Sequence, residues 1–143
     1  MQTDRVVLDT NCLLVSLARQ GSAYPVWQGF QEERYTLCVT NEILEEYEEV
    51  IARKTRPEIA RNVIDFIMQQ KNVEFIDPYF RMELITADPD DNKFVDCAFA
   101  ANATYIVSDD THYDVLRDLS FPQILVLKLQ TFIEKLKSAE TLF

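Results

Sequence analysis

Residues 88–110 read DPDDNKFVDCAFAANATYIVSDD, and this stretch decides the fold. Residues 92–102 show a helical pattern, and residues 94–101 within it are apolar almost all round, which predicts a buried helix. Residues 104–107 (TYIV) form a short β-type run that predicts a buried strand. Polar residues follow that strand at once: Ser108, Asp109 and Asp110. Acids just beyond the carboxyl end of a buried strand are typical of an α/β domain with its site at that edge of the sheet.

The same alternation runs through the rest of the chain. Further strands are predicted at residues 5–8, 35–40, 73–76 and 124–127, and further helices at residues 23–33, 42–54, 58–70 and 131–138. Strands that alternate with helices over short connections predict an α/β fold with a central, mostly parallel five-stranded sheet. The chain has 143 residues, the usual size of one domain, so we expect residues 1–143 to form a single domain.

The composition argues against several classes of site. The chain has two glycines, too few for a glycine-rich phosphate loop, and it carries no Walker A or GxGxxG motif. With His112 as its single histidine, a Ser-His-Asp hydrolase and a His/Cys zinc site are both disfavoured. Three cysteines in apolar segments predict buried free thiols in a reducing compartment. Without a signal-peptide pattern or a run of ~20 apolar residues, we expect a cytoplasmic protein that does not enter a membrane.

The net charge of −10 opposes a general nucleic-acid coat, because phosphate binding normally comes from lysine and arginine. Bound divalent cations would offset part of this charge at a site, and a basic partner would cover an acidic face. The charge therefore favours a protein that binds cations or basic surfaces.

Three connections bring polar side chains to the same edge of the predicted sheet. Asp9, Thr10 and Asn11 follow the first strand, Thr40 and Asn41 follow the second, and the residues from Ser108 to Asp110 follow the fourth. Asp9 is either a helix N-cap or a ligand, and Asn11 either holds a ligand water or caps the helix itself. Asp109 and Asp110 are adjacent, so we expect one of them to face the crevice.

Two more acids come from helices. Helix 42–54 carries five glutamates, and its periodicity places Glu46 and Glu48 at the two edges of the buried stripe without choosing between them. Asp96 is the single charge in FVDCAFAA, residues 94–101, and is predicted to be buried. A buried carboxylate is costly unless it is paired or bound to metal, and Lys93 is the one basic residue nearby. Asp91 is predicted to be a supporting acid, and Asp88 and Asp90 to form a capping cluster.

We therefore expect Asp9, one helix glutamate, Asp96 and Asp110 to converge. Like charges brought close do not all stay ionised without a cation. Oxygen ligands without imidazole or thiol suit Mg²⁺ or Mn²⁺, which polarise phosphoryl oxygens and generate hydroxide from bound water. His112 is predicted to be a surface residue rather than a general base.

These residues lie in motifs that resemble the PIN-domain family, in particular its VapC-like toxin branch. The motifs are VVLDTN (residues 6–11), TNEILEEYEEVI (40–51), the stretch 88–110, and FPQILVL followed by FIEKL (121–136), so the resemblance spans nearly the whole chain. It implies a PIN-like three-layer α/β/α fold and magnesium-dependent ribonuclease activity. It also implies a homodimer and a small cognate antitoxin with a basic segment.

Carried over by position, the resemblance implies catalytic and metal-ligand roles for Asp9, Glu46, Asp96 and Asp110, and so selects Glu46 over Glu48. It implies supporting roles for Thr10, Asn11, Thr40, Asp91 and Ser108. Thr40 stands where the family often has serine. Asp109 stands where glycine is frequent, which leaves open which of the two aspartates binds the metal.

Three alternatives remain. A haloacid-dehalogenase-like phosphatase needs a second Asp two residues after the first, where this chain has Asn11. A receiver-type signalling domain needs a lysine after a late strand, and the candidate, Lys128, lies inside an apolar run. A catalytically weak or inactive PIN module would serve as a protein-interaction scaffold, against which the intact set of acids argues.

Overall fold

The sheet of the computed structural model has five strands, and every neighbouring pair is parallel. The structure describes residues 3–78, 81, 83–85, 89–121 and 123–141. The strand order is β3-β2-β1-β4-β5, with β1 (Arg5–Leu8), β2 (Thr36–Val39), β3 (Val73–Phe75), β4 (Tyr105–Val107) and β5 (Val126–Leu127). The predicted five-stranded sheet is confirmed, and within the described residues it is parallel throughout.

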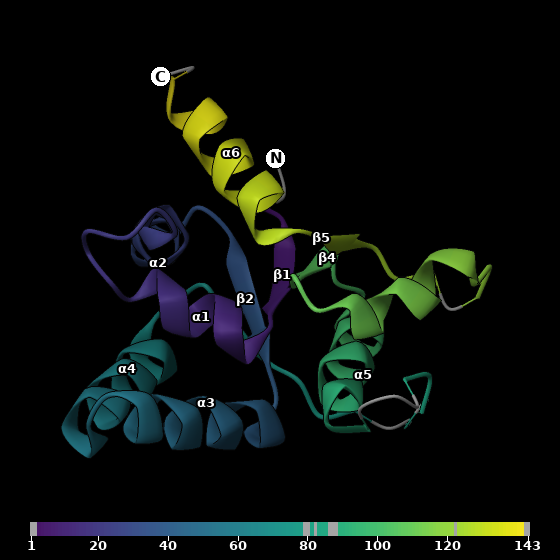
Figure 1. Ribbon diagram of the computed structural model, residues 1–143, viewed down its shortest axis with the longest axis horizontal. Coiled ribbons are helices and arrows are strands. Elements are labelled where there is room, and N and C mark those ends of the chain that lie inside the picture. The colour runs from purple at the N-terminus through teal and green to yellow at the C-terminus, as the bar shows by residue number, and fades with distance from the viewer. Residues whose placement is uncertain (1–2, 79–80, 82, 86–88, 122, 142–143) are drawn as a thin grey trace.

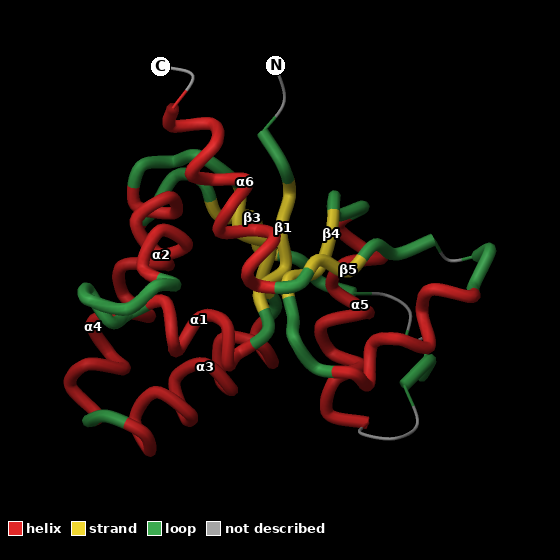
Figure 2. Tube along the Cα trace, turned by 45° about the horizontal axis from the view of Figure 1, so that its top comes forward, coloured by secondary structure: helices red, strands yellow, loops and turns green. Residues whose placement is uncertain are grey.

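Helices cover both faces of this sheet. They are α1 (Thr10–Ser16), α2 (Tyr24–Gln31), α3 (Asn41–Lys54), α4 (Pro57–Gln69), α5 (Asn92–Ala101) and α6 (Leu129–Thr141), with the 3₁₀ segments η1 (Pro89–Asp91) and η2 (Thr111–Asp118). In Figures 1 and 2, α1 to α4 lie on one side of the strands and α5 lies on the other. The predicted three-layer α/β/α architecture is therefore confirmed.

The central strands are apolar because they are covered on both faces. The side chains of Val6, Val7 and Leu8 in β1 are buried, as are those of Ile106 and Val107 in β4. Strands of this kind contribute backbone to the sheet and side chains to both cores, so the first polar residue after each strand marks the end of the core. This is why the acids of the sequence gather at one edge.

Two helix ends matter for that edge. The N-cap of α3 is Thr40, whose hydroxyl accepts a hydrogen bond of 3.1 Å from the backbone N–H of Ile43. At the other end of α3, Arg53 and Lys54 lie in the last turn, where positive charge suits the helix dipole. Arg53 and Lys54 thus lie at the carboxyl end of the same helix that carries Glu46 in its middle.

Two segments were not predicted as helical. Helix α1 is short and follows directly on β1, so its apolar residues extend the strand pattern instead of showing a helical period. Segment η2 is a 3₁₀ helix, and its three-residue repeat escapes a search for a 3.6-residue period. The three cysteines are buried and free, as predicted. Every helix in the described part of the chain is too short or too polar to cross a lipid bilayer.

Candidate metal centre

A cavity of about 580 Å³ opens at the carboxyl ends of β1 and β4. The backbone N–H of Asp9 donates to the carbonyl of Val107 over 3.1 Å, so the residues that follow the two strands start side by side. The cavity is lined by Asp9, Thr10, Asn11, Cys12, Val15, Val50, Arg53, Lys54, Asp91, Asp109, Asp110 and Leu129. A crevice outside the carboxyl ends of parallel strands is where such sheets hold their ligands.

Ser108 joins the acids that follow β1 and β4. Its hydroxyl donates to Asp9 Oδ2 over 2.6 Å and accepts from the backbone N–H of Asp110 over 3.0 Å. Asp9 is also the N-cap of α1, because its Oδ1 accepts from the backbone N–H of Asn11 over 3.0 Å. The carboxylate of Asp9 therefore caps a helix and also lines the cavity, and its role as a metal ligand stays a prediction.

Glu46 is held from two sides. The hydroxyl of Thr10 donates to its Oε2, and the ammonium group of Lys93 lies 2.7 Å from its Oε1. The side chain of Glu46 is 26% exposed, whereas Glu48 is exposed to solvent. The packing of α3 thus turns Glu46, and not Glu48, toward the ends of the strands.

Asp91, Asp110 and His112 form the tightest cluster of the site. The Nδ1 atom of His112 lies 3.2 Å from Asp91 Oδ2 and 3.2 Å from Asp110 Oδ1. One donor atom from each of the three residues lies within 4.8 Å of the others, a spacing that suits a single metal ion. Asp91 is the N-cap residue of α5, yet its side chain makes no capping hydrogen bond.

Tyr113 places a hydroxyl among these acids. Its side chain is 1% exposed, and its buried oxygen has no hydrogen-bond partner among the residues that the structure describes. Burial raises the pKa of Tyr113, and the negative charges nearby raise it further; these are Asp9, Asp91, Asp110 and Glu46. The charges of four carboxylates, one of them on α3, therefore act on one unsatisfied polar atom, which native proteins seldom leave without a water or an ion.

The charge balance of the cluster suits a cation. Burial raises the pKa of Asp9; the hydrogen bonds from Ser108 and Asn11 oppose this, and the charges of Asp110 and Glu46 add to it. Lys93 compensates one of the four carboxylates. The remaining oxygen donors are those that Mg²⁺ and Mn²⁺ accept, so the residues present fit a divalent ion.

The family comparison points to the same chemistry. The sequence model of the PIN domain matches residues 5–112. The chain belongs to the PIN-domain family. PIN domains are generally nucleases that use divalent metal ions, and Asp91, Asp110 and His112 of this chain are spaced closely enough to hold one. No sequence among the curated proteins matches the chain closely enough to count as a relative.

Solved structures share the fold at low sequence identity. VapBC2 from Rickettsia felis, bound to a DNA fragment from its promoter, has a TM-score of 0.59 at 17% identity over 87% of this chain and 98% of that one. DNA-bound VapBC from Salmonella typhimurium has 0.54 at 16% identity over 90% and 99%. The RRP44 PIN domain of T. brucei has 0.56 at 13% identity over 97% and 84%.

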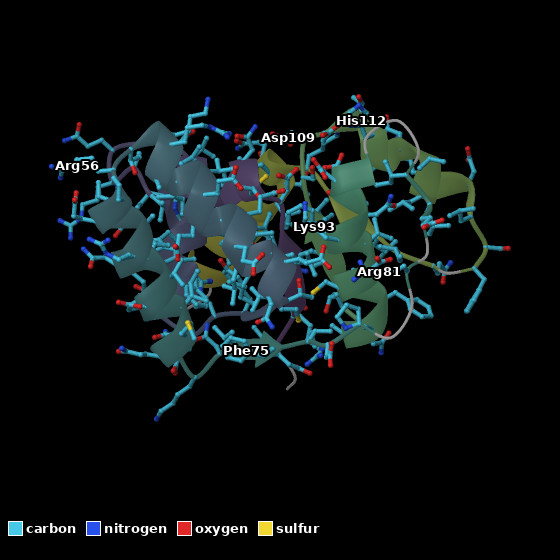
Figure 3. All side chains as sticks on the ribbon, turned by 90° about the horizontal axis from the view of Figure 1, so that it is seen from below. Arg56, Phe75, Arg81, Lys93, Asp109 and His112 are labelled. Atoms are coloured by element: carbon cyan, nitrogen blue, oxygen red, sulfur yellow. The ribbon has the colours of Figure 1, made fainter. Side chains whose placement is uncertain are left out.

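Asp96 lies apart from the cavity of this PIN domain. It is 4% exposed, as predicted, but it lines a second cavity of about 470 Å³ together with Glu42, Arg81, Glu83, Ile85, Asp90, Asn92 and Lys93. In Figure 3, Lys93 lies between Arg81 on one side and Asp109 and His112 on the other. Of the predicted set, Asp9 and Asp110 line the first cavity together with Asp91, whereas Asp96 lines the second. The metal-ligand roles of these residues stay predictions.

Two other expected site residues serve as helix caps. Thr40 caps α3, as described above. The Oδ1 atom of Asp109 accepts from the backbone N–H of Leu129 over 2.9 Å, which fixes the start of α6, whereas Asp110 joins the cluster. Asn11 is exposed at the cavity wall.

Sequence reasoning missed three residues of the site. His112 follows Asp110 by two positions and is predicted to be a surface residue, whereas the structure places its ring against two carboxylates. No helix is predicted at the position of Tyr113, so the sequence does not indicate a role for it. Lys93 is close to Asp96 in sequence, but its ammonium group pairs with Glu46. The sequence offered one indication for all three: each lies within three residues of an acid of the site.

Proposed function

We propose that this PIN domain is a metal-dependent endoribonuclease that hydrolyses RNA phosphodiester bonds with Mg²⁺ or Mn²⁺. One observation carries the proposal: Asp9, Asp91 and Asp110 line one cavity, and their charges act, with that of Glu46, on the buried hydroxyl of Tyr113, which has no hydrogen-bond partner among the described residues. Lys93 is paired with Glu46. A pocket of this kind is stable when a divalent ion supplies the missing positive charge.

The ion would be held by Asp9, Glu46, Asp91 and Asp110. We choose Asp91 over Asp96 because Asp91 lines the same cavity as Asp9 and Asp110, and Asp96 lines another. When bound, the ion supplies a polarised phosphoryl oxygen and a water of lowered pKa, so no covalent nucleophile is required of the protein.

The neighbouring residues hold these ligands in place. Ser108 fixes the Asp9 carboxylate and the backbone of Asp110 with a single hydroxyl. Thr10 and Lys93 each take one oxygen of Glu46, so this side chain cannot turn away from the site. The ligand oxygens are therefore preorganised by contacts with α1, α5 and the turn after β4.

Arg53 and Lys54 are suited to hold the RNA backbone. Both line the cavity that also contains Asp9 and Asp110, so the cavity has an acidic side and a basic side. A phosphate next to the scissile one would lie against the two cations, while the scissile phosphate meets the ion. This arrangement lets a chain of net charge −10 bind a polyanion locally.

We further propose that the protein is the toxin of a toxin–antitoxin pair, acts in the cytoplasm as a homodimer, and forms one domain from residue 1 to residue 143. The fold shared with the two VapBC proteins and the family resemblance support this. A basic antitoxin segment would be attracted to the acidic side of the cavity and would compete there with the metal ion.

Cleavage of labelled single-stranded RNA by paired variants tests the catalytic proposal. Asp110→Asn and Asp91→Asn should each abolish metal-dependent cleavage, because each removes a ligand charge. The control is Asp114→Asn, an acid of η2 that is paired with Arg117 at 3.6 Å and should leave the rate unchanged. Wild-type rates in the Asp110 variant would refute the proposal, and a loss in Asp96→Asn but not in Asp91→Asn would return the role to Asp96.

RNA binding by a metal-free protein tests the basic side. Arg53→Gln with Lys54→Gln should weaken binding and lower the slope of log K against log salt by about 1.4, from two phosphate contacts on a single strand. The matched control is Arg61→Gln with Lys71→Gln, two exposed cations that are absent from the cavity wall. Equal slopes in the two double variants would contradict the assignment.

A further inference from the structure

We infer that His112 is a direct ligand of the divalent ion, so that the centre is a mixed carboxylate–imidazole site that prefers Mn²⁺ and later first-row ions to Mg²⁺. This inference rests on the proposed function, because it concerns the same ion. It changes the expected donor set from oxygen alone to oxygen with one nitrogen.

The distances fit a shared ion. In an octahedral site with bonds of about 2.1 Å, two neighbouring donors lie about 3.0 Å apart. The Nδ1 atom of His112 lies 3.2 Å from an oxygen of Asp91 and 3.2 Å from an oxygen of Asp110. Each separation is close to one edge of such an octahedron. One ligand atom from each of the three residues lies within 4.8 Å of the others, so a single ion at this position would be in reach of all three.

The backbone holds the imidazole in position. The N–H of His112 donates to Asp110 Oδ1 over 2.9 Å, so the first turn of η2 is closed around the carboxylate that would bind the ion. The ring is 37% exposed, and the side chains of Asp91 and Asp110 are 13% and 33% exposed. The cluster is thus enclosed enough to be ordered and open enough for an ion to enter.

A second observation points to a ligand at the same place. The next residue along η2 is Tyr113, whose buried hydroxyl has no hydrogen-bond partner in the described part of the chain and is acted on by the charges of Asp91 and Asp110. An ion held by the cluster would carry waters, because Mg²⁺ and Mn²⁺ retain several of them. One such water would satisfy the Tyr113 hydroxyl. An ion pair between His112 and the two aspartates would leave that hydroxyl unsatisfied.

The nitrogen donor has a consequence for metal choice. Mg²⁺ takes oxygen ligands, whereas imidazole suits transition metals, and affinity for such sites rises from Mn²⁺ through Fe²⁺ to Co²⁺. The wild-type protein should therefore prefer Mn²⁺ to Mg²⁺ more strongly than a variant without the imidazole. Glutamine at position 112 keeps a polar side chain of similar length but offers an oxygen donor in place of the ring nitrogen.

The test is pulsed EPR of the full, tag-free chain loaded with Mn²⁺ alone. Since His112 is the single histidine, growth on ¹⁵N-histidine labels this residue only. We expect a ¹⁵N hyperfine coupling to Mn²⁺ that is absent in His112→Gln. We also expect Mn²⁺ to bind at least tenfold more weakly to that variant, since even residues that only support a ligand contribute about that much. Asp114→Asn, on the same 3₁₀ helix, should behave as the wild type.

The outcomes separate the two proposals. If Mn²⁺ binds and shows no ¹⁵N coupling, and His112→Gln binds it equally well, then His112 is an ion-pair partner and the inference is overturned while the proposed nuclease centre stands. If Mn²⁺ does not bind to the wild-type chain, both fall. Circular dichroism of each variant shows whether a loss of binding comes from unfolding, and a folded His112→Gln variant with weaker binding and no coupling supports the inference.

Discussion

Replacing Lys93 by methionine should destabilise the metal-free protein, and the loss of stability should be smaller when a divalent ion is bound. The substitution removes an ammonium group that lies 2.7 Å from Glu46 Oε1 and also donates to the carbonyl of Asp90 over 2.8 Å. Methionine keeps most of the aliphatic stem, so the loss is mainly one of charge and hydrogen bonds. The remaining carboxylates then repel one another without their paired cation.

The size of the effect follows from burial. The side chains of Lys93 and Glu46 are 14% and 26% exposed, so the pair is largely shielded from solvent. A hydrogen bond to a charged group under such conditions contributes about 2 kcal/mol. For 143 residues the entropy of unfolding is about 0.3 kcal/mol/K, so the melting temperature should fall by about 7 °C.

Thermal unfolding in EDTA and in saturating Mn²⁺ measures both parts of the prediction. Lys135→Met is the matched control, because Lys135 also pairs with one carboxylate, Asp4 at 3.2 Å, but with side chains that are 55% and 33% exposed. Each lysine lies over one aromatic ring, at 5.6 Å from the Phe94 centroid and 5.4 Å from that of Tyr105, so this contact is matched too. The exposed pair should contribute less than about 1 kcal/mol.

Mn²⁺ should reduce the loss in Lys93→Met, because the ion restores positive charge beside Glu46. It should not change the loss in Lys135→Met, which lies away from the cluster. Equal losses for the two variants in EDTA would refute the reasoning, as would a loss in Lys93→Met that is the same with and without the ion.

Three further predictions concern single groups. Tyr113→Phe removes an unpartnered hydroxyl and should leave metal-free stability unchanged or slightly higher, whereas Tyr47→Phe removes a 2.6 Å hydrogen bond to a backbone carbonyl and should cost about 1 kcal/mol in a thermal melt. Burial raises the pKa of Cys12 to about 12, so this thiol should stay unreactive toward a disulfide reagent at about pH 8 until the chain is unfolded. Rapid labelling of the native protein would contradict the burial of Cys12. The pKa of Asp9 is raised in the folded state, so metal-free stability should fall as the pH rises from the ordinary pKa of this carboxyl through the raised one. Over that pH range the melting temperature of Asp9→Asn should rise relative to that of the wild type. A constant difference between the two melting temperatures would show that the pKa shift is absent.

The sheet and its functional edge were readable from the sequence. Buried parallel strands are continuous apolar runs, so β1 was predicted at its observed bounds, and the first polar residues after β1 and β4 marked the edge of the core. For this reason Asp9, Ser108 and Asp110 could be placed together. Periodicity narrowed the helix acid to Glu46 or Glu48, and the packing of α3 against α1 and α5 made the choice.

The acid from the α5 region was not readable in the same way. The apolar pattern correctly shows that Asp96 is buried, but burial does not say which cavity a side chain faces. Asp91 lies at the junction of η1 and α5, where side-chain direction depends on a local turn and not on helical period. The position of His112 depends likewise on a 3₁₀ turn, which leaves no periodic signal. Tertiary packing, and not the local sequence pattern, determines where the side chains of these residues point.

The most direct test of the metal centre is an anomalous difference map from a crystal soaked in Mn²⁺. The account predicts that the strongest peak lies at the carboxyl ends of β1 and β4, within bonding distance of Asp91 and Asp110. A map without such a peak, or with its strongest peak beside Asp96 in the second cavity, would contradict it.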